Sequence, residues 1–205
     1  MLVFDASGSM ASMGYNGLDQ PRIVDARTAM REALPGITPF RRVGLITYGP
    51  GSGDACANIE LRLPPTPNAA AAIISEIDQI QPAGDTPLTE AVLAAAETLM
   101  YREKPGTVVL VTDGKETCDG ATCAVAQELF SDGVALTVHV IGFKVRADFF
   151  QWQGTETDGG GPVETAAACL SERTGGQYFA AESIEDLVRA LQETLGCPIL
   201  SRLDT

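Results

Sequence analysis

The stretch Thr107-Val108-Val109-Leu110-Val111-Thr112-Asp113-Gly114 decides the fold of this chain. Its apolar run is continuous, which is typical of a parallel strand that helices cover on both faces. An aspartate and a glycine follow directly, so the predicted strand 107–112 ends in a turn that carries a carboxylate. The stretch therefore predicts an α/β sheet with a polar group at the carboxyl end of one strand.

Helix-like and strand-like segments alternate on both sides of this stretch. Helices are predicted at 23–34, 68–80, 87–101, 121–130, 163–174 and 184–195, and further strands at 2–4, 43–48, 59–63, 135–143 and 178–180. Pro21 and Pro35 bracket the first helix, and Asn68 caps the second. The order predicts a doubly wound α/β fold with a mostly parallel sheet and helices on both faces.

The 205 residues suit one domain, 1–205. No apolar run approaches the roughly 18 residues that a membrane helix needs. The chain opens on Met1-Leu2-Val3-Phe4 without a basic segment, so no signal peptide is predicted. Because it opens almost inside a strand, we expect a truncated N-terminus. The net charge of −13 and the lack of a basic cluster argue against a nucleic-acid partner.

The chain has five cysteines: Cys56, Cys118, Cys123, Cys169 and Cys197. Zinc would need four closely spaced ligands, and only Cys118 and Cys123 are close, so zinc is disfavoured. We expect a Cys118–Cys123 disulfide and an extracytoplasmic location (periplasmic, secreted or surface-exposed); the alternative is two free thiols in a reducing cytosol. Cys169 is expected to be buried in its helix, Cys197 is expected to be the odd thiol, and Cys56 has no assigned partner.

Five oxygen-bearing side chains lie where loops should converge: Asp5, Ser7, Ser9, Thr86 and Asp113. The first three follow a strand at every second position, and Gly8 between the serines favours a tight curl. Thr86 lies on a turn, expected to be exposed, that opens the helix at Pro87. Ligands of doubly wound sheets bind at strand carboxyl ends. Hydroxyls and carboxylates favour Mg²⁺, with Mn²⁺ or Ca²⁺ as alternatives.

These positions carry a resemblance to a known family. Asp5-x-Ser7-x-Ser9, the threonine of Gly-Asp-Thr-Pro-Leu and the aspartate of Val-Thr-Asp-Gly resemble the metal-ion-dependent adhesion site of von Willebrand factor type A domains of the bacterial type. The resemblance spans nearly the whole chain. It implies a Rossmann-like sheet with one antiparallel edge strand, here 59–63. It also implies that the hydroxyls ligate directly and the aspartates through water, and that a partner's acidic side chain completes the coordination.

The segment 144–162 looks longer than in bacterial members of that family. It carries Phe149, Phe150 and Trp152, and aromatic residues are enriched at interfaces. We expect these side chains to help choose the partner. The alternative is that they pack onto the domain's own core.

The pattern predicts a metal-dependent protein-binding module and not an enzyme. A metal-dependent hydrolase or phosphatase is the main alternative, but the chain has no second-metal cluster, P-loop or nucleophile elbow. His139 lies in an apolar strand, where a packed residue is expected and not a catalytic base. Two further alternatives are an assembly module that works beside an ATPase and a domain whose metal only joins loops.

Overall fold

The computed structural model describes residues 1–13, 20–114, 116–144 and 164–196. They include a six-stranded sheet in the order β3-β2-β1-β4-β5-β6. The strands are β1 (Leu2–Asp5), β2 (Val43–Tyr48), β3 (Ile59–Thr66), β4 (Gly106–Thr112), β5 (Leu136–Phe143) and β6 (Tyr178–Ala181). Neighbouring strands are parallel except β2 and β3. The predicted mostly parallel sheet with one antiparallel edge strand is confirmed, and that strand contains the predicted segment 59–63.

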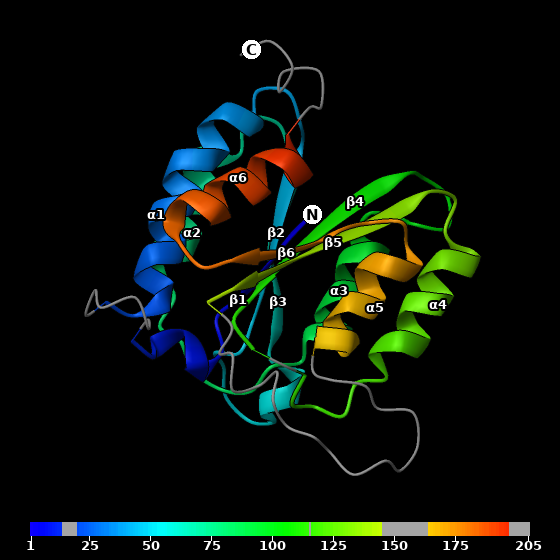
Figure 1. Cartoon of the computed structure of the whole chain (residues 1–205), viewed down its shortest axis with the longest axis horizontal. Coiled ribbons are helices and arrows are strands. Elements are labelled where there is room, and N and C mark those ends of the chain that lie inside the picture. Colours follow the sequence, from blue (N-terminus) through cyan, green and yellow to red (C-terminus); the bar gives the residue numbers. More distant parts are fainter. Residues whose placement is uncertain (14–19, 115, 145–163, 197–205) are drawn as a thin grey trace.

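Helices cover both faces of the sheet, with α1, α2 and α6 on one face and α3, α4 and α5 on the other (Figure 1). Their bounds are α1 (Arg22–Ile37), α2 (Ala70–Gln79), α3 (Leu88–Thr98), α4 (Thr122–Asp132), α5 (Glu164–Arg173) and α6 (Ile184–Leu195). Successive strand side chains point to opposite faces. Leu2 and Phe4 of β1 therefore pack with the first group of helices, and Val3 packs with the second. This two-sided burial explains the unbroken apolar runs. None of the described helices is long and apolar enough to cross a membrane.

The strand order places the ends of β1 and β4 side by side. The chain moves outward from β1 through β2 to β3 and then returns to β4 on the other side of β1. Phe4 of β1 lies opposite Val111 of β4 in parallel register. Doubly wound sheets bind ligands where the strand order reverses in this way. Asp5 ends β1 and Asp113 follows β4 at this point.

Several helix boundaries differ from those predicted, and two of the differences have a clear physical reason. Helix α1 continues to Ile37 with Pro35 in its last turn, where a missing N–H forgoes one helical hydrogen bond without ending the helix. Asn68 has a φ of 54° and precedes the helix that it was expected to cap. Instead, the N–H of Ala70 donates to Thr38 Oγ1 at 3.3 Å. That cap comes from the end of α1, so no pattern within the second helix could predict it.

Candidate metal centre

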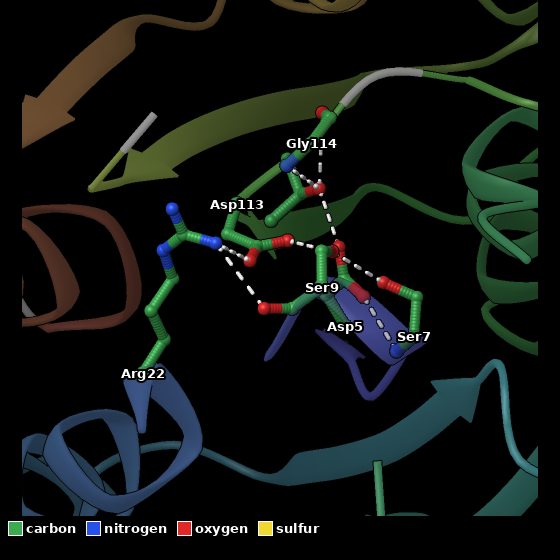
Figure 2. A network of polar contacts seen from close by, with 7 residues as sticks. Asp5, Ser7, Ser9, Arg22, Asp113 and Gly114 are labelled. Carbon is green, nitrogen blue, oxygen red and sulfur yellow. Dashed lines mark hydrogen bonds and ion pairs between the residues drawn. The ribbon is translucent and has the colours of Figure 1, made fainter. Parts of the chain in front are cut away.

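Oxygen atoms from two loops meet at the carboxyl ends of β1 and β4 (Figure 2). Asp5 Oδ1 accepts the N–H of Ser7 at 2.8 Å. The hydroxyl oxygens of Ser7 and Ser9 are 3.0 Å apart, and Ser9 Oγ donates to Asp113 Oδ1 at 2.6 Å. Four of the five predicted ligand residues therefore lie in one continuous network, although Asp113 is more than a hundred positions from the others.

Thr86 comes from a third loop, which precedes α3. The N–H of Gly8 donates to Gly84 O at 3.0 Å, which joins this loop to the serine-bearing one. The Thr86 N–H donates to Thr117 Oγ1 at 2.8 Å, and the Thr117 N–H donates back to Thr86 O at 3.2 Å. Gly84 and Asp85 of the predicted turn are exposed as expected, but Thr86 itself is only 5% exposed. Its hydroxyl has no hydrogen-bond partner among the described residues, so Oγ1 is available as a ligand.

Two glycines allow the three loops behind the site to pack closely. Gly49 has a φ of +112°, and a Cβ there would lie 2.7 Å from Ser7 Cα and from Ala83 O. Gly84 has a φ of +76°, and a Cβ there would lie 2.2 Å from Gly49 O. Both positions therefore require glycine. Gly8 does not: the chain turns tightly there, in the 3-10 helix Gly8–Ala11, but its φ is not positive and a Cβ on it would meet its nearest neighbour at an ordinary 3.5 Å, so this turn does not require glycine.

Thr112 orients the Asp5 carboxylate. Its hydroxyl donates to Asp5 Oδ2 at 2.6 Å and accepts the N–H of Gly114 at 3.2 Å. With the Ser7 N–H on Oδ1, both oxygens of Asp5 have protein partners, which suits a carboxylate that acts on a metal through water. Tyr48 is fully buried beside this group. Burial, and then the Asp5 charge, raise the pKa of Tyr48 well above its ordinary value, so its phenol is neutral.

Arg22, like Thr112, is a residue at this site that the sequence did not single out. Its Nη1 donates to Asp113 Oδ2 at 2.8 Å and to Ser9 O at 3.2 Å (Figure 2). The two ion-paired side chains are 4% and 0% exposed. Arg22 is the first residue of α1, and a cation in that position ordinarily lies in solvent. Only the three-dimensional structure brings it to the site.

The charges of the site favour a bound cation. Asp5 and Asp113 are 0% and 2% exposed. Burial, and then the charge of Asp5, raise the pKa of Asp113 to about 6, although Ser9 and Arg22 oppose the shift. Two neighbouring buried carboxylates destabilise each other unless cations or protons neutralise them, and Arg22 offsets only one of the two charges. A hard divalent ion would relieve the repulsion between these carboxylates, and the hydroxyls beside them are donors that such an ion accepts.

The residue types at the site fit Mg²⁺ better than a soft metal. No cluster of three or more His, Cys, Asp or Glu side chains that could hold a metal occurs within the described ranges. The candidate site has two carboxylates, and hydroxyls and water must supply the remaining ligands. Mg²⁺ keeps several waters and prefers oxygen, so this donor set suits it.

The expected Cys118–Cys123 disulfide is wrong. Cys118 is bonded to Cys56, which lies on the short 3-10 helix Ala55–Ala57, and Cys123 is bonded to Cys169. Cys123 lies in the first turn of α4 and faces α5, whereas Cys118 faces the loop after β2, so these sequence neighbours point in different directions. The bonds join residues 62 and 46 positions apart. In the chain-entropy account each contributes about 4 kcal/mol, more than a short loop would.

The remaining predicted residues lie away from the metal centre or outside the described residues. His139 is half-buried in β5, where its Nδ1 accepts the Gln177 N–H at 3.2 Å, as expected for a packed strand residue. Burial, and then Arg41, lower its pKa. Phe149, Phe150, Trp152 and Cys197 lie outside the described residues. A surface hollow lined by residues that include Arg42, Lys104 and Gly106 lies at the amino ends of the strands, opposite the candidate centre.

The sheet and its polar loops define a Rossmann-like α/β domain with a candidate cation site at its switch point. The chain belongs to the von Willebrand factor type A domain family, whose sequence model matches residues 1–116. The match includes all five predicted ligand residues, from Asp5 to Asp113.

A UPF0353 protein from Mycolicibacterium paratuberculosis is 29% identical over 206 residues, which cover 91% of this chain and 56% of that protein. The chain thus spans little more than half the length of this relative. Mussel byssus proximal thread matrix protein 1, solved with a zinc-occupied MIDAS motif, has a TM-score of 0.62 at 16% identity over 95% of this chain and 44% of its own. The SpaC pilus adhesin of Lactobacillus rhamnosus GG has a TM-score of 0.64 at 18% identity over 95% and 29%. These two likenesses establish a shared fold.

Proposed function

We propose that this domain binds one Mg²⁺ through Asp5, Ser7, Ser9, Thr86 and Asp113 and uses the ion to bind a carboxylate of a protein partner. The observation that carries the proposal is the buried network of hydroxyls and carboxylates that joins the loops after β1 and β4. Asp5 and Asp113 carry one more negative charge than the buried Arg22 offsets, and this excess and the available threonine hydroxyl on the adjoining loop support it.

The donor set explains why a bound ion would take an outside ligand. Mg²⁺ requires six oxygen ligands in an octahedral arrangement. The three hydroxyls of Ser7, Ser9 and Thr86 add no negative charge, and Asp5 already uses both oxygens within the protein. Water must therefore complete the coordination. A carboxylate from another protein can replace one such water. The net charge of −13 repels an acidic partner, but salt screens this repulsion at distances beyond about 8–10 Å.

Extracytoplasmic location is part of the proposal. Two disulfides join described residues, and disulfides persist in oxidising compartments. Two proteins of similar fold are a pilus adhesin and a matrix protein of the mussel byssus, which are both proteins of the cell exterior or of an extracellular fibre.

The proposal can be tested with Mn²⁺ in place of Mg²⁺, because Mn²⁺ reports its bound waters through water-proton relaxation. The loaded protein should show exchangeable water, and acetate should reduce that signal by displacing it. Acetamide has nearly the same shape but no charge, and it should have little effect. Relaxation that acetate leaves unchanged would contradict carboxylate binding at the ion.

Hydrolysis is the rival function to exclude in the same preparation. Turnover of p-nitrophenyl phosphate or p-nitrophenyl acetate that requires Mg²⁺ and disappears in Asp113→Asn would identify a hydrolase instead. A loaded site that holds no exchangeable water would identify an ion that only joins loops.

A further inference from the structure

Arg22 places a permanent positive charge inside the candidate metal centre. One guanidinium nitrogen contacts both a predicted ligand, Asp113, and the carbonyl of another, Ser9. The guanidinium is a cationic group, so Arg22 adds one positive charge to the centre. A buried charge acts more strongly than a surface charge, because the surrounding dielectric is lower.

The neighbouring acid on the same helix has a different partner. Asp25 lies one turn after Arg22 on α1 and is also buried, but its carboxylate is paired with Lys144, which is itself 3% exposed. Asp25 and Lys144 thus neutralise each other. Among the described buried groups at the centre, the charges are two carboxylates, Asp5 and Asp113, and one guanidinium, which sum to −1.

This net charge affects how tightly the centre would bind a divalent ion and how strongly the loaded centre would attract an anion. With the ion bound, the described buried groups and the ion together carry +1. Without the guanidinium they would carry 0. A surplus positive charge weakens the hold on the ion, but it strengthens attraction for an incoming anion. Arg22 therefore weakens the binding of the ion alone and strengthens the binding of a carboxylate to the ion-loaded centre.

We propose that Arg22 is a charge-setting residue of the metal centre: it lowers the affinity for the divalent cation alone and raises the affinity of the loaded centre for an acidic ligand. The inference rests on the proposed function. The charge of Arg22 makes the binding of the cation and of the acidic partner cooperative, so that each binds better in the presence of the other, as linkage requires.

A purely positioning role gives the opposite expectation. The Arg22 contact occupies Asp113 Oδ2 while Ser9 occupies Oδ1, so the arginine also holds the carboxylate in place. If that were its main contribution, any weaker contact would loosen cation binding. Glutamine separates the two roles, because its amide can still donate to the aspartate but carries no charge.

The test measures Mn²⁺ affinity by calorimetry, and acetate affinity of the Mn²⁺-loaded protein by water-proton relaxation, at pH 8, where Asp113 is ionised. Arg22→Gln should bind Mn²⁺ about tenfold more tightly and acetate about tenfold more weakly than the wild type. Arg31→Gln removes a charge from the exposed face of the same helix and should change neither affinity. Mn²⁺ affinity that is unchanged or lower in folded Arg22→Gln would overturn the proposal.

Arg22→Lys is the complementary variant, which tests the idea even where the glutamine variant does not fold. It keeps the charge and loses the planar fork, so both affinities should stay within about threefold of the wild type. Loss of Mn²⁺ binding in folded Arg22→Lys would show that positioning dominates and would overturn the charge-setting role. Wild-type protein that binds no Mn²⁺ would instead overturn the proposed function itself, so the two failures are distinguishable.

Discussion

Ser9 Oγ donates a 2.6 Å hydrogen bond to Asp113 Oδ1, although the two residues are 104 positions apart. The bond joins the loop after β1 to the loop after β4, the two strands between which the order of the sheet reverses. It is also the point where a hydroxyl and a carboxylate, both predicted ligands, approach most closely. The position of the candidate metal centre therefore follows directly from the strand order.

The first prediction concerns Ser9→Ala. The variant removes a predicted ligand and the hydrogen bond to Asp113, so the Mn²⁺ affinity should fall by about tenfold to a hundredfold. Ser12→Ala changes an exposed serine at the end of the same short helix and should leave the affinity unchanged. Calorimetry on both proteins checks this, and equal affinities would remove Ser9 from the site.

The second prediction concerns two glycines of the adjoining loops. Gly84→Ala should lower the free energy of unfolding by about 2 kcal/mol or more, because it combines a positive φ with a backbone clash at 2.2 Å. Gly8→Ala should change it by no more than about 0.5 kcal/mol, because its Cβ has room. Urea unfolding measures both. Similar losses in the two variants would show that the loops do not pack as described.

The third prediction concerns pH. The pKa of Asp113 is raised from 3.8 to about 6 in the folded protein, so the folded state holds that proton more tightly than the unfolded chain. This group stabilises the metal-free protein below about pH 4, and its contribution is lost as the pH rises through 6, on the order of 3 kcal/mol. Cation affinity should rise over the same interval, because the ion replaces the proton.

Asp113→Asn isolates this effect from the other acids. The free energy of unfolding of both proteins is measured with EDTA at pH 4, 5, 6 and 7.5. The wild type should lose stability relative to the variant steadily as the pH rises. A difference that does not depend on pH would contradict a raised Asp113 pKa.

The fourth prediction compares the two disulfides. Cys118 follows Thr117, whose backbone and hydroxyl are bonded to Thr86, so the Cys56–Cys118 bond braces a predicted ligand. The double variant Cys56→Ser/Cys118→Ser should lose stability and bind Mn²⁺ several-fold more weakly.

The matched variant opens the other disulfide. Cys123→Ser/Cys169→Ser should lose a similar stability of about 2–4 kcal/mol, because that bond joins α4 to α5 and contacts no predicted ligand. Its Mn²⁺ affinity should stay at the wild-type value. A reduced affinity in both variants, or in neither, would show that the Cys56–Cys118 bond has no particular relation to the centre.

The fold could be predicted because its evidence is local. The apolar run 107–112 indicates a buried parallel strand by itself, and its aspartate marks the carboxyl end. The cap of α2 could not be predicted in this way, because Thr38 reaches Ala70 from another helix. The disulfides could not be predicted either, because spacing along the chain does not show which way Cys118 and Cys123 face.

The candidate site likewise contains residues that could be predicted from the sequence and residues that could not. Asp5, Ser7 and Ser9 follow one another closely enough for their spacing to be informative. Arg22 and Thr112 are both buried against the site carboxylates, yet their positions in the sequence, the start of a helix and the end of a strand, indicate nothing unusual. Their roles depend on which atoms face the carboxylates, and only the packed structure determines that.

The central claim is that these loops bind a divalent cation, and titration of Mn²⁺ into the protein at pH 8 tests it most directly. The wild type should bind one ion per chain, and Asp5→Ala should abolish that binding while remaining folded, because Asp5 lies at the base of the network. Asp132→Ala, on the exposed end of α4, should bind as the wild type does. Absence of binding to the wild type, or equal binding to Asp5→Ala, would contradict the account.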